Sequence, residues 1–271
     1  MSTTPSFTTR RESFADGLTI RFDERETSGR PILILHGGGG PQTVLSIAAG
    51  LDKAHTLLPT HPGFDGEPRP EWFNSIDDLA FAYLDLLERL NLRDVLVIGS
   101  SVGGWIASAM ALRDTAQRLG GLVLVNGVGI LVDGHPIPDV SALAPQELAA
   151  LSFHNPAALR IDPSTITPES IAARKANTET LYTYDSARLG GDPKLARRLS
   201  HVKIPVLVAW GESDRVADLE YGRVYAQSFA NARFEPIAEA GHLPQIEQPE
   251  RLLLLVRKFS ISTRATTPTA E

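Results

Sequence analysis

The sequence predicts an α/β fold in which helices cover both faces of a mostly parallel, twisted β-sheet. Short, continuous apolar runs alternate with segments of helical periodicity along most of the chain. Runs of this kind, without polar alternation, are typical of strands that are buried on both faces of a parallel sheet. Two of them, residues 31–35 and 95–98, end in glycine-rich turns. Together these observations indicate a sheet with right-handed crossovers and helices on both sides.

Length and charge limit the class of partner. With 271 residues, the chain can bury a core large enough for one α/β domain that carries an insertion. The formal net charge is −6, so the protein lacks the broad basic surface that binding of nucleic acid or anionic lipid usually needs. No apolar run approaches a membrane span and the first residues contain no signal-peptide core, so we expect a cytoplasmic protein with a small-molecule partner. The oligomeric state is not indicated by the sequence.

The first elements are expected to form an antiparallel edge of the sheet. Short runs at residues 7–11 and 18–22 flank Asp16-Gly17, a strong signal for a two-residue hairpin turn. The buried strand at 31–35 follows, and a further strand is expected at 55–58. Residues 61–68 contain too much proline and glycine for regular structure and predict a loop.

The middle of the chain continues the alternation. Ser75 and Asp78 resemble a capping box, and apolar residues then recur at helical spacing as far as Leu90. The next expected elements, in order, are a strand at 95–98, a helix at 105–113 and a strand at 122–125.

The alternation breaks between residues 127 and 200, where prolines interrupt short helical patterns and no run resembles a strand. We interpret this segment as a helical insertion, and the alternative is a second independent domain. Its expected helices span 145–151 and 192–199. The alternation then resumes with segments expected at 205–210, 219–229, 233–237 and 249–259, before a flexible tail at 261–271.

The pentapeptide Gly99-Ser100-Ser101-Val102-Gly103 predicts a nucleophile elbow, a tight turn between a strand and a helix that exposes a serine hydroxyl. Only Ser101 satisfies the Gly-x-Ser-x-Gly register. Gly99 and Gly103 fit because a side chain at either position would collide with the neighbouring strand or helix. The alternative interpretation is a glycine-rich turn without chemical function.

A serine nucleophile needs a histidine to accept its proton and an acid to orient that histidine. His242 follows the expected strand at 233–237, in a loop at the edge where parallel strands build a site. Asp214 follows the strand at 205–210, which gives the chain order serine, acid, histidine. Glu212, Asp218 and Asp133 are the competing candidates for the acid.

The transition state also needs two donors for the oxyanion. We expect the backbone N–H of Val102, at the start of a helix, to be one of them. The other is expected from the glycine loop, at Gly38, with Gly37 or Gly39 as alternatives. His36 is interpreted as a structural brace of that loop.

The glycine loop and the histidines give no sign of a phosphate-binding or metal-binding site. The glycine loop matches neither the Gly-x-Gly-x-x-Gly nor the Gly-Lys-Ser/Thr template. The seven histidines show no metal-ligand spacing, and the absence of cysteine excludes thiolate ligands and a thiol nucleophile. We therefore expect a mechanism without metal or cofactor.

Four separated motifs together resemble the α/β-hydrolase superfamily, over a stretch from Pro31 to Phe259. The resemblance implies the α/β-hydrolase fold, a triad of Ser101, Asp214 and His242, and a core of residues 1–127 and 201–260 under a helical cap of residues 128–200. The motifs are His36-Gly37-Gly38-Gly39, Gly99-Ser100-Ser101-Val102-Gly103, Gly211-Glu212-Ser213-Asp214 and Gly241-His242-Leu243-Pro244.

Within the superfamily, the glycine loop, the loop at 62–66 and the motif from Gly241 to Glu247 are similar to those of meta-cleavage product hydrolases and related esterases. That group usually has Asn before the nucleophile and Trp after the histidine, where this chain has Ser100 and Leu243. The cap arginine with which the group binds a dienoate would correspond to Arg188. A serine rather than an aspartate at the elbow disfavours epoxide hydrolases and haloalkane dehalogenases.

We therefore expect a serine hydrolase, similar to carboxylesterases, that cleaves a small, largely apolar ester through an acyl-enzyme. The alternatives are hydrolysis of the C–C bond of a vinylogous diketone, and a ligand receptor on the same fold that turns nothing over. The expected substrate contacts are Gly37, Gly39, Leu243, Tyr182 and Phe153. An apolar wall of the cap is expected from Leu143, Leu148, Leu151, Phe153, Leu181 and Tyr182.

Overall fold

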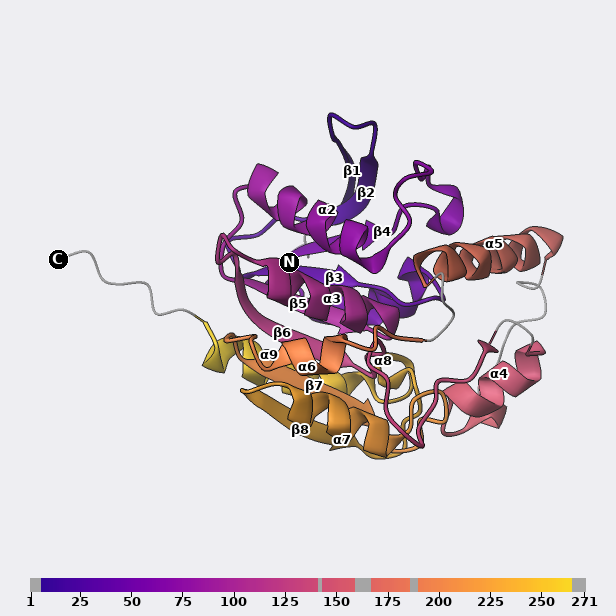
Figure 1. Cartoon of the computed structure of the whole chain (residues 1–271). Coiled ribbons are helices and arrows are strands. Elements are labelled where there is room, and N and C mark those ends of the chain that lie inside the picture. Colours follow the sequence, from indigo (N-terminus) through magenta and orange to yellow (C-terminus); the bar gives the residue numbers. More distant parts are fainter. Residues whose placement is uncertain (1–5, 141–142, 159–166, 186–189, 265–271) are drawn as a thin grey trace, which may run out of the picture.

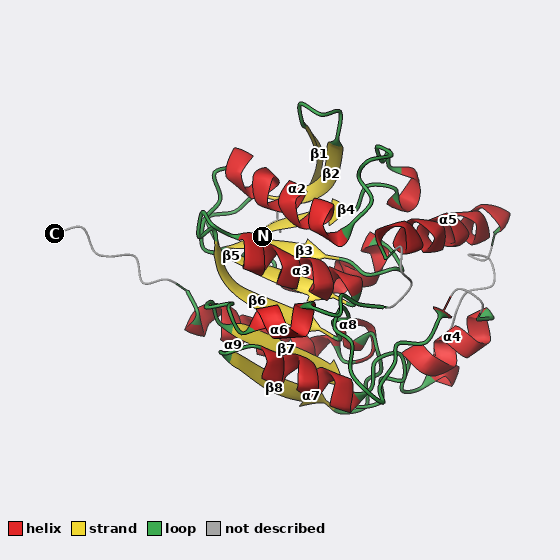
Figure 2. Ribbon diagram, viewed as in Figure 1, coloured by secondary structure: helices red, strands yellow, loops and turns green. Residues whose placement is uncertain are grey.

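The computed structural model describes residues 6–140, 143–158, 167–185 and 190–264 (Figures 1 and 2). An eight-stranded sheet has the order β1-β2-β4-β3-β5-β6-β7-β8; β2 is antiparallel to both neighbours and all other pairs are parallel. The predicted α/β fold with a mostly parallel sheet is thereby confirmed. The strands are β1 (Thr8–Ser13), β2 (Thr19–Arg25), β3 (Pro31–Leu35), β4 (His55–Thr60), β5 (Val95–Ser100), β6 (Leu119–Val125), β7 (Val206–Gly211) and β8 (Ala232–Ile237).

Helices cover both faces of this sheet (Figure 1). The apolar side chains of α2 (Ile76–Arg89), α3 (Val102–Arg113), α6 (Leu195–Leu199) and α7 (Leu219–Ser228) belong to one core cluster. Those of α1 (Leu45–Gly50) and α9 (Pro249–Ser262) belong to a second cluster on the opposite face. The short α8 (Pro244–Glu247) lies between β8 and α9.

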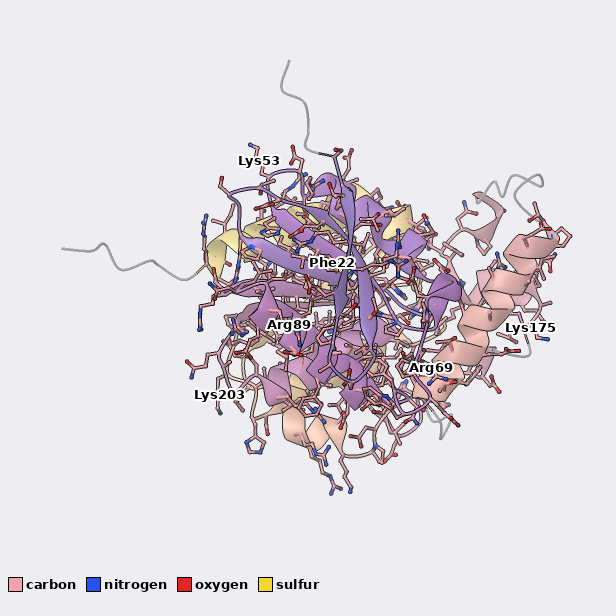
Figure 3. The ribbon with its side chains drawn as sticks, turned by 90° about the horizontal axis from the view of Figure 1, so that it is seen from above. Phe22, Lys53, Arg69, Arg89, Lys175 and Lys203 are labelled. Carbon is pink, nitrogen blue, oxygen red and sulfur yellow. The ribbon has the colours of Figure 1, made fainter. Side chains whose placement is uncertain are left out.

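The continuous apolar strands divide their side chains between the two clusters. In β3, Leu33 and Leu35 belong to the first cluster, while Ile32 and Ile34 belong to the second. Successive side chains of a strand point to opposite faces, so a strand covered on both sides must be apolar throughout. Figure 3 shows the contrast with the surface, where Lys53 and Lys203 extend outward at the periphery while Phe22 of β2 is fully buried.

The capping box predicted at the start of α2 is present, whereas the turn predicted for the first hairpin is not. The capping box is confirmed, because Ser75 accepts the N–H of Asp78 and the Asp78 carboxylate accepts the N–H of Ser75. The first hairpin is confirmed as antiparallel, but its predicted two-residue turn is wrong. The N–H of Phe14 pairs with Leu18, and the intervening loop ends at Gly17 with φ of 86°. A left-handed glycine after a type I turn gives a three-residue loop.

Three helices were not predicted, namely α1, α5 and the short α8, and α3 and α9 are longer than expected. The short α1 follows the glycine loop, after a 3₁₀ turn at Pro41–Val44. The long α5 (Pro168–Tyr184) occupies the segment where only short helical patterns were expected. At the C-terminus, α9 continues to Ser262, three residues beyond its predicted end at 259 and into the expected tail.

The segment between β6 and β7 carries α4 (Pro145–Ser152) and α5, which lie beyond the end of the sheet toward which the parallel strands point (Figure 1). Three side chains of α5 attach it to the loop after β4. Asn177 exchanges two hydrogen bonds with Asp65, Thr180 donates to the carbonyl of Gly63, and Tyr184 donates to that of Pro62. No helix in the described part of the chain is long and apolar enough to cross a membrane.

Candidate active site

Ser101 lies at the junction of β5 and α3, with φ of 54° and ψ of −120°. A non-glycine residue in this region is strained, and only tight surroundings maintain it. Here the surroundings are two close backbone approaches. A Cβ atom on Gly99 would lie 2.2 Å from the carbonyl oxygen of Gly103, and one on Gly103 would lie 2.2 Å from that of Leu35. Both glycines of the motif are therefore required by packing.

The structure brings Ser101, His242 and Asp214 together from loops that follow β5, β8 and β7. His242 Nε2 lies 2.9 Å from Ser101 Oγ, and His242 Nδ1 lies 2.8 Å from Asp214 Oδ2. His242 and Asp214 are buried. Since a carboxylate only accepts hydrogen bonds, Nδ1 carries the imidazole proton. Nε2 then presents a lone pair to the hydroxyl of Ser101, as a general base must.

The competing acids lie elsewhere. Asp218 caps α7 by accepting the N–H of Tyr221, and its other oxygen pairs with His135 at 2.6 Å. These hydrogen bonds hold the pKa of Asp218 below its ordinary value, against the opposing effect of desolvation. Glu212 and Asp133 are not among the contacts of His242, and of the four candidates Asp214 is the one that this histidine contacts.

Asp214 accepts hydrogen bonds from three other groups besides His242. Its Oδ1 accepts the N–H groups of Val216 and Ala217, at 2.8 and 3.1 Å. Its Oδ2 also accepts Asn126 Nδ2, at 2.7 Å. Sequence reasoning missed Asn126, which directly follows β6; an asparagine after a buried strand was the one available signal.

Val102 and Gly38 carry the two backbone N–H groups that were expected to serve as oxyanion donors. The N–H of Val102 begins α3, where the helix dipole is positive. Gly38 lies in the loop after β3, and a Cβ atom there would lie 2.9 Å from Leu181 Cδ2. No hydrogen bond between described residues uses either N–H. Gly37 packs on the serine itself, because its own Cβ would lie 2.7 Å from Ser101 Cβ.

The end of α4 supports the histidine and acid loops. The N–H of His242 donates to Ser152 O at 2.7 Å, and Arg215 donates to the carbonyls of Ala150 and Phe153. Glu247 accepts the N–H of Gly241 and that of His154. Phe153, expected to contact substrate, is thus buried against these loops.

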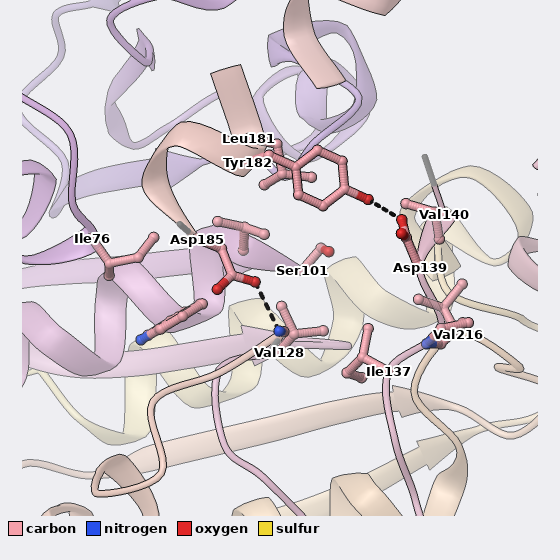
Figure 4. A pocket seen from close by; sticks show the side chains of 14 residues that line it. Ile76, Ser101, Val128, Ile137, Asp139, Val140, Leu181, Tyr182, Asp185 and Val216 are labelled. Carbon is pink, nitrogen blue, oxygen red and sulfur yellow. Dashed lines mark hydrogen bonds between the residues drawn. The ribbon is translucent and has the colours of Figure 1, made fainter. Parts of the chain in front are cut away.

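A cavity opens beside Ser101 (Figure 4). Leu181 and Tyr182 line it, as expected for the apolar wall. The hydroxyl of Tyr182 donates to Asp139 Oδ1 at 2.6 Å and so joins α5 to the loop after β6. The other described lining residues are Ile76, Val102, Trp105, Val128, Ile137, Pro138, Val140, Asp185, Gly190 and Val216.

Most other expected contacts do not line this cavity in the described part of the chain. Gly37, Gly39, Leu243 and Phe153 are absent from its lining, and so are Leu143, Leu148 and Leu151. Gly39 lies against Thr43, where a Cβ would meet Thr43 Cγ2 at 2.7 Å, and Leu243 caps α8. Arg188 lies outside the described residues. Leu181 and Tyr182 are therefore the residues of the expected set that line the cavity.

His36 and His61 brace the glycine loop, as interpreted for His36. Their rings stack with centroids 3.7 Å apart. His36 Nε2 accepts the N–H of His61 at 3.1 Å, so its Nδ1 donates to Gly37 O at 2.7 Å. His61 Nε2 donates to His36 O, and its Nδ1 accepts the hydroxyl of Tyr83. Every ring nitrogen is used by a neutral tautomer, and burial lowers the pKa of His36 to about 4 and that of His61 well below its usual value.

This brace predicts a loss of stability in acid. Below pH 6.5 an unfolded His36 takes up a proton, whereas the folded residue does so only near pH 4, so the stability present above pH 6.5 is lost as the pH falls toward 4. His36 alone should lower the free energy of unfolding by about 3 kcal/mol over that interval. Denaturant unfolding at pH 7 and pH 4 measures it. His36→Gln should flatten the pH dependence by this amount and the exposed His201→Gln should leave it unchanged; equal slopes in all three proteins would contradict the assignment.

Comparisons with known proteins bear on the family and the fold of the chain. A family model described as the alpha/beta hydrolase family matches residues 32–253. Among curated proteins, a 2-hydroxy-6-oxononadienedioate/2-hydroxy-6-oxononatrienedioate hydrolase of Burkholderia vietnamiensis is 26% identical over 266 residues, covering 89% of this chain and 91% of the relative. A 2-hydroxymuconate semialdehyde hydrolase of Pseudomonas putida is 26% identical over 283 residues, covering 92% and 93%.

Solved structures share the fold. The meta-cleavage product hydrolase CumD of Pseudomonas fluorescens superimposes with a TM-score of 0.75 at 20% identity, covering 93% of this chain and 97% of that one. A thermophilic esterase of Thermogutta terrifontis gives a TM-score of 0.72 at 22% identity, covering 96% and 100%. The solved structures of similar fold therefore include both a meta-cleavage product hydrolase and an esterase.

Proposed function

The chain belongs to the alpha/beta hydrolase family, and from that premise we propose that it is a serine hydrolase in which Ser101 attacks the carbonyl carbon of a small molecule. The observation that carries the proposal is the continuous hydrogen-bonded chain from Ser101 Oγ through the His242 imidazole to Asp214 Oδ2. A hydroxyl is a poor nucleophile at neutral pH, and this chain supplies the base that activates it. We further propose that residues 128–200 form a cap over Ser101, because Ile137, Asp139 and Leu181 line its cavity.

In the first half-reaction, Ser101 Oγ forms a bond to the carbonyl carbon while its proton passes to His242 Nε2. The negative charge that develops on the carbonyl oxygen is stabilised by the N–H groups of Val102 and Gly38. Asp214 stabilises the imidazolium without accepting its proton. His242 then protonates the leaving group as the bond between that group and the acyl carbon breaks.

In the second half-reaction, His242 removes a proton from a water molecule that attacks the acyl-enzyme. Collapse of the tetrahedral intermediate returns that proton to Ser101 Oγ and releases a carboxylic acid. The substrate thus gains one water overall. The scheme uses no group beyond the side chains and backbone donors already described.

The chemistry of the cavity favours a neutral, largely apolar carboxylic ester. Its described lining is mainly aliphatic, and the charged side chains within that lining are the carboxylates Asp139 and Asp185. Lysine and arginine do not occur in the described lining. Carboxylates near a pocket disfavour a substrate that is itself an anion.

C–C bond hydrolysis is the second candidate, and the names of the curated relatives favour it over the ester. There the bond that breaks joins the acyl carbon to another carbon, which leaves with the electron pair and is protonated. A substrate such as a dienedioate carries carboxylates and needs a cation. Arg188 is the candidate from the sequence, and it lies outside the described residues.

A matched substrate panel separates the two candidates. The full chain would be assayed with p-nitrophenyl butyrate, with the p-nitrophenyl hemiester of succinate, and with a meta-ring-fission product. We expect kcat/KM for the butyrate to exceed that for the hemisuccinate by about tenfold or more, and to exceed that for the ring-fission product.

The opposite ranking would overturn the ester proposal. Faster turnover of the ring-fission product, lost in Arg188→Gln, would establish C–C hydrolysis instead. Thermal stabilisation by ligands without turnover of any substrate would indicate a receptor.

A further inference from the structure

Asn126 is a fully buried polar residue at the meeting point of the loops that carry the proposed triad. It directly follows β6 and has φ of 47°, in the left-handed region that asparagine adopts more readily than most other non-glycine residues. Its backbone N–H donates to Ala209 O in the neighbouring β7, at 3.0 Å. The backbone is therefore fixed between two strands before the side chain makes any contact.

The side-chain amide of Asn126 reaches both catalytic loops. Oδ1 accepts the N–H of Gly211 at 3.1 Å, while Nδ2 donates to Asp214 Oδ2 at 2.7 Å and to Gly241 O at 3.4 Å. The reversed amide would turn its oxygen toward the Asp214 carboxylate and its nitrogen toward an N–H donor. Because both of those contacts would be repulsive, the hydrogen-bond network assigns the orientation.

Asp214 Oδ2 consequently accepts two hydrogen bonds, one from Asn126 and one from His242. With the two backbone donors on Oδ1, the buried carboxylate accepts four hydrogen bonds from described residues. These four hydrogen bonds fix the plane of the carboxylate. Without Asn126, the oxygen that orients His242 would keep the imidazole as its one described donor.

We propose that Asn126 is a positioning residue for the hydrolytic reaction, acting through Asp214 and His242. This inference rests on the proposed function of Ser101, Asp214 and His242. Asn126 does not belong to the described lining of the cavity at Ser101, so its replacement should change kcat and leave KM unchanged.

Asn126→Asp gives the sharpest test, because it keeps the shape and replaces the amide donor by a titratable group. When ionised, the introduced carboxyl group would place a second negative charge against Asp214 Oδ2. When protonated, its hydroxyl would restore the donor to Oδ2 while its carbonyl still accepts the N–H of Gly211. Adjacent carboxylates share a proton over a raised pH range, so the restored form is favoured in mild acid.

The experiment measures kcat and KM for p-nitrophenyl butyrate at pH 5.5 and pH 8.5. We expect N126D to lose at least about tenfold in kcat at pH 8.5, and to come within about threefold of the wild type at pH 5.5. N126A should lose about tenfold at both pH values. KM should stay within about twofold throughout.

Asn177→Asp is the matched control, because Asn177 also donates to a carboxylate, that of Asp65, and accepts a backbone N–H. Asn177 anchors α5, which lines the cavity, so Asn177→Asp should raise KM. It should not cause the pH-dependent loss of kcat that is expected for N126D. A merely structural role of Asn126 would give N126D the same loss at both pH values, and that result would overturn the proposal. So would a kcat for N126D within twofold of the wild type at pH 8.5.

Melting temperatures at both pH values establish that each variant is folded during the assay. The comparison of N126D with itself at two pH values also stands if N126A does not fold. The proposed function fails separately, if a fluorophosphonate does not label Ser101 of the wild type. A labelled, active wild type with an unaltered N126D contradicts the role of Asn126 alone.

Discussion

Asp214→Asn should lower kcat about 10⁴-fold while the protein stays folded. Four donors surround the Asp214 carboxylate, so an amide placed there must turn its NH₂ group toward at least one of them. The contact that can adapt is the one with His242, whose proton can move from Nδ1 to Nε2. Nε2 would then be a donor and could no longer accept the proton of Ser101.

Steady-state kinetics with a p-nitrophenyl ester measure the effect, which should fall on kcat with little change in KM. Asp218→Asn is the matched control, since asparagine caps a helix as well as aspartate does and Asp218 does not contact His242. Its kcat should stay within about twofold of the wild type. A loss below tenfold in Asp214→Asn would mean that another acid orients His242.

The elbow illustrates what local sequence can predict. Two glycines and one serine at fixed spacing specify a turn in which the backbone of α3 approaches both its own strand and β3. The distances from Gly99 and Gly103 to their neighbours show that this requirement comes from sterics. The capping box of α2 and the apolar strands are local signals of the same kind, and they were predicted correctly.

Asn126 illustrates what local sequence could not predict. Its contacts lie 85 to 115 residues away along the chain, at Gly211, Asp214 and Gly241. They exist only because β6 and β7 are neighbours and their loops meet at one edge of the sheet. A single asparagine carries no periodicity from which this arrangement could be inferred.

The helix α5 was missed for a related reason. A search for apolar periodicity assumes that the buried face of a helix is apolar. The face of α5 toward the loop after β4 carries Asn177, Thr180 and Tyr184, and each makes a hydrogen bond there. With polar residues on both faces, the helical period disappears from the hydropathy pattern.

Of the expected substrate contacts, Tyr182 lines the cavity in the described part of the chain, and Gly37, Gly39, Leu243 and Phe153 do not. Leu243 adjoins His242 but caps α8, and Phe153 packs on the histidine loop. The segment between β6 and β7 lines the cavity with Leu181, which was expected, and with Ile137 and Asp139, which were not. Its selectivity therefore depends on tertiary packing.

The serine nucleophile is the central claim, and Ser101→Ala should lower kcat about 10⁶-fold. Alanine removes the attacking oxygen, whereas the neighbouring Ser100 is buried and its hydroxyl accepts a hydrogen bond from Gln245. Ser100→Ala therefore serves as the matched control and should keep the activity.

Mass spectrometry after incubation with a fluorophosphonate tests the claim most directly. The wild type and Ser100→Ala should each gain one adduct, which peptide mapping places on Ser101, and lose hydrolysis in step with labelling. Ser101→Ala should gain none. An adduct that persists in Ser101→Ala, or hydrolysis that survives complete labelling, would contradict the account.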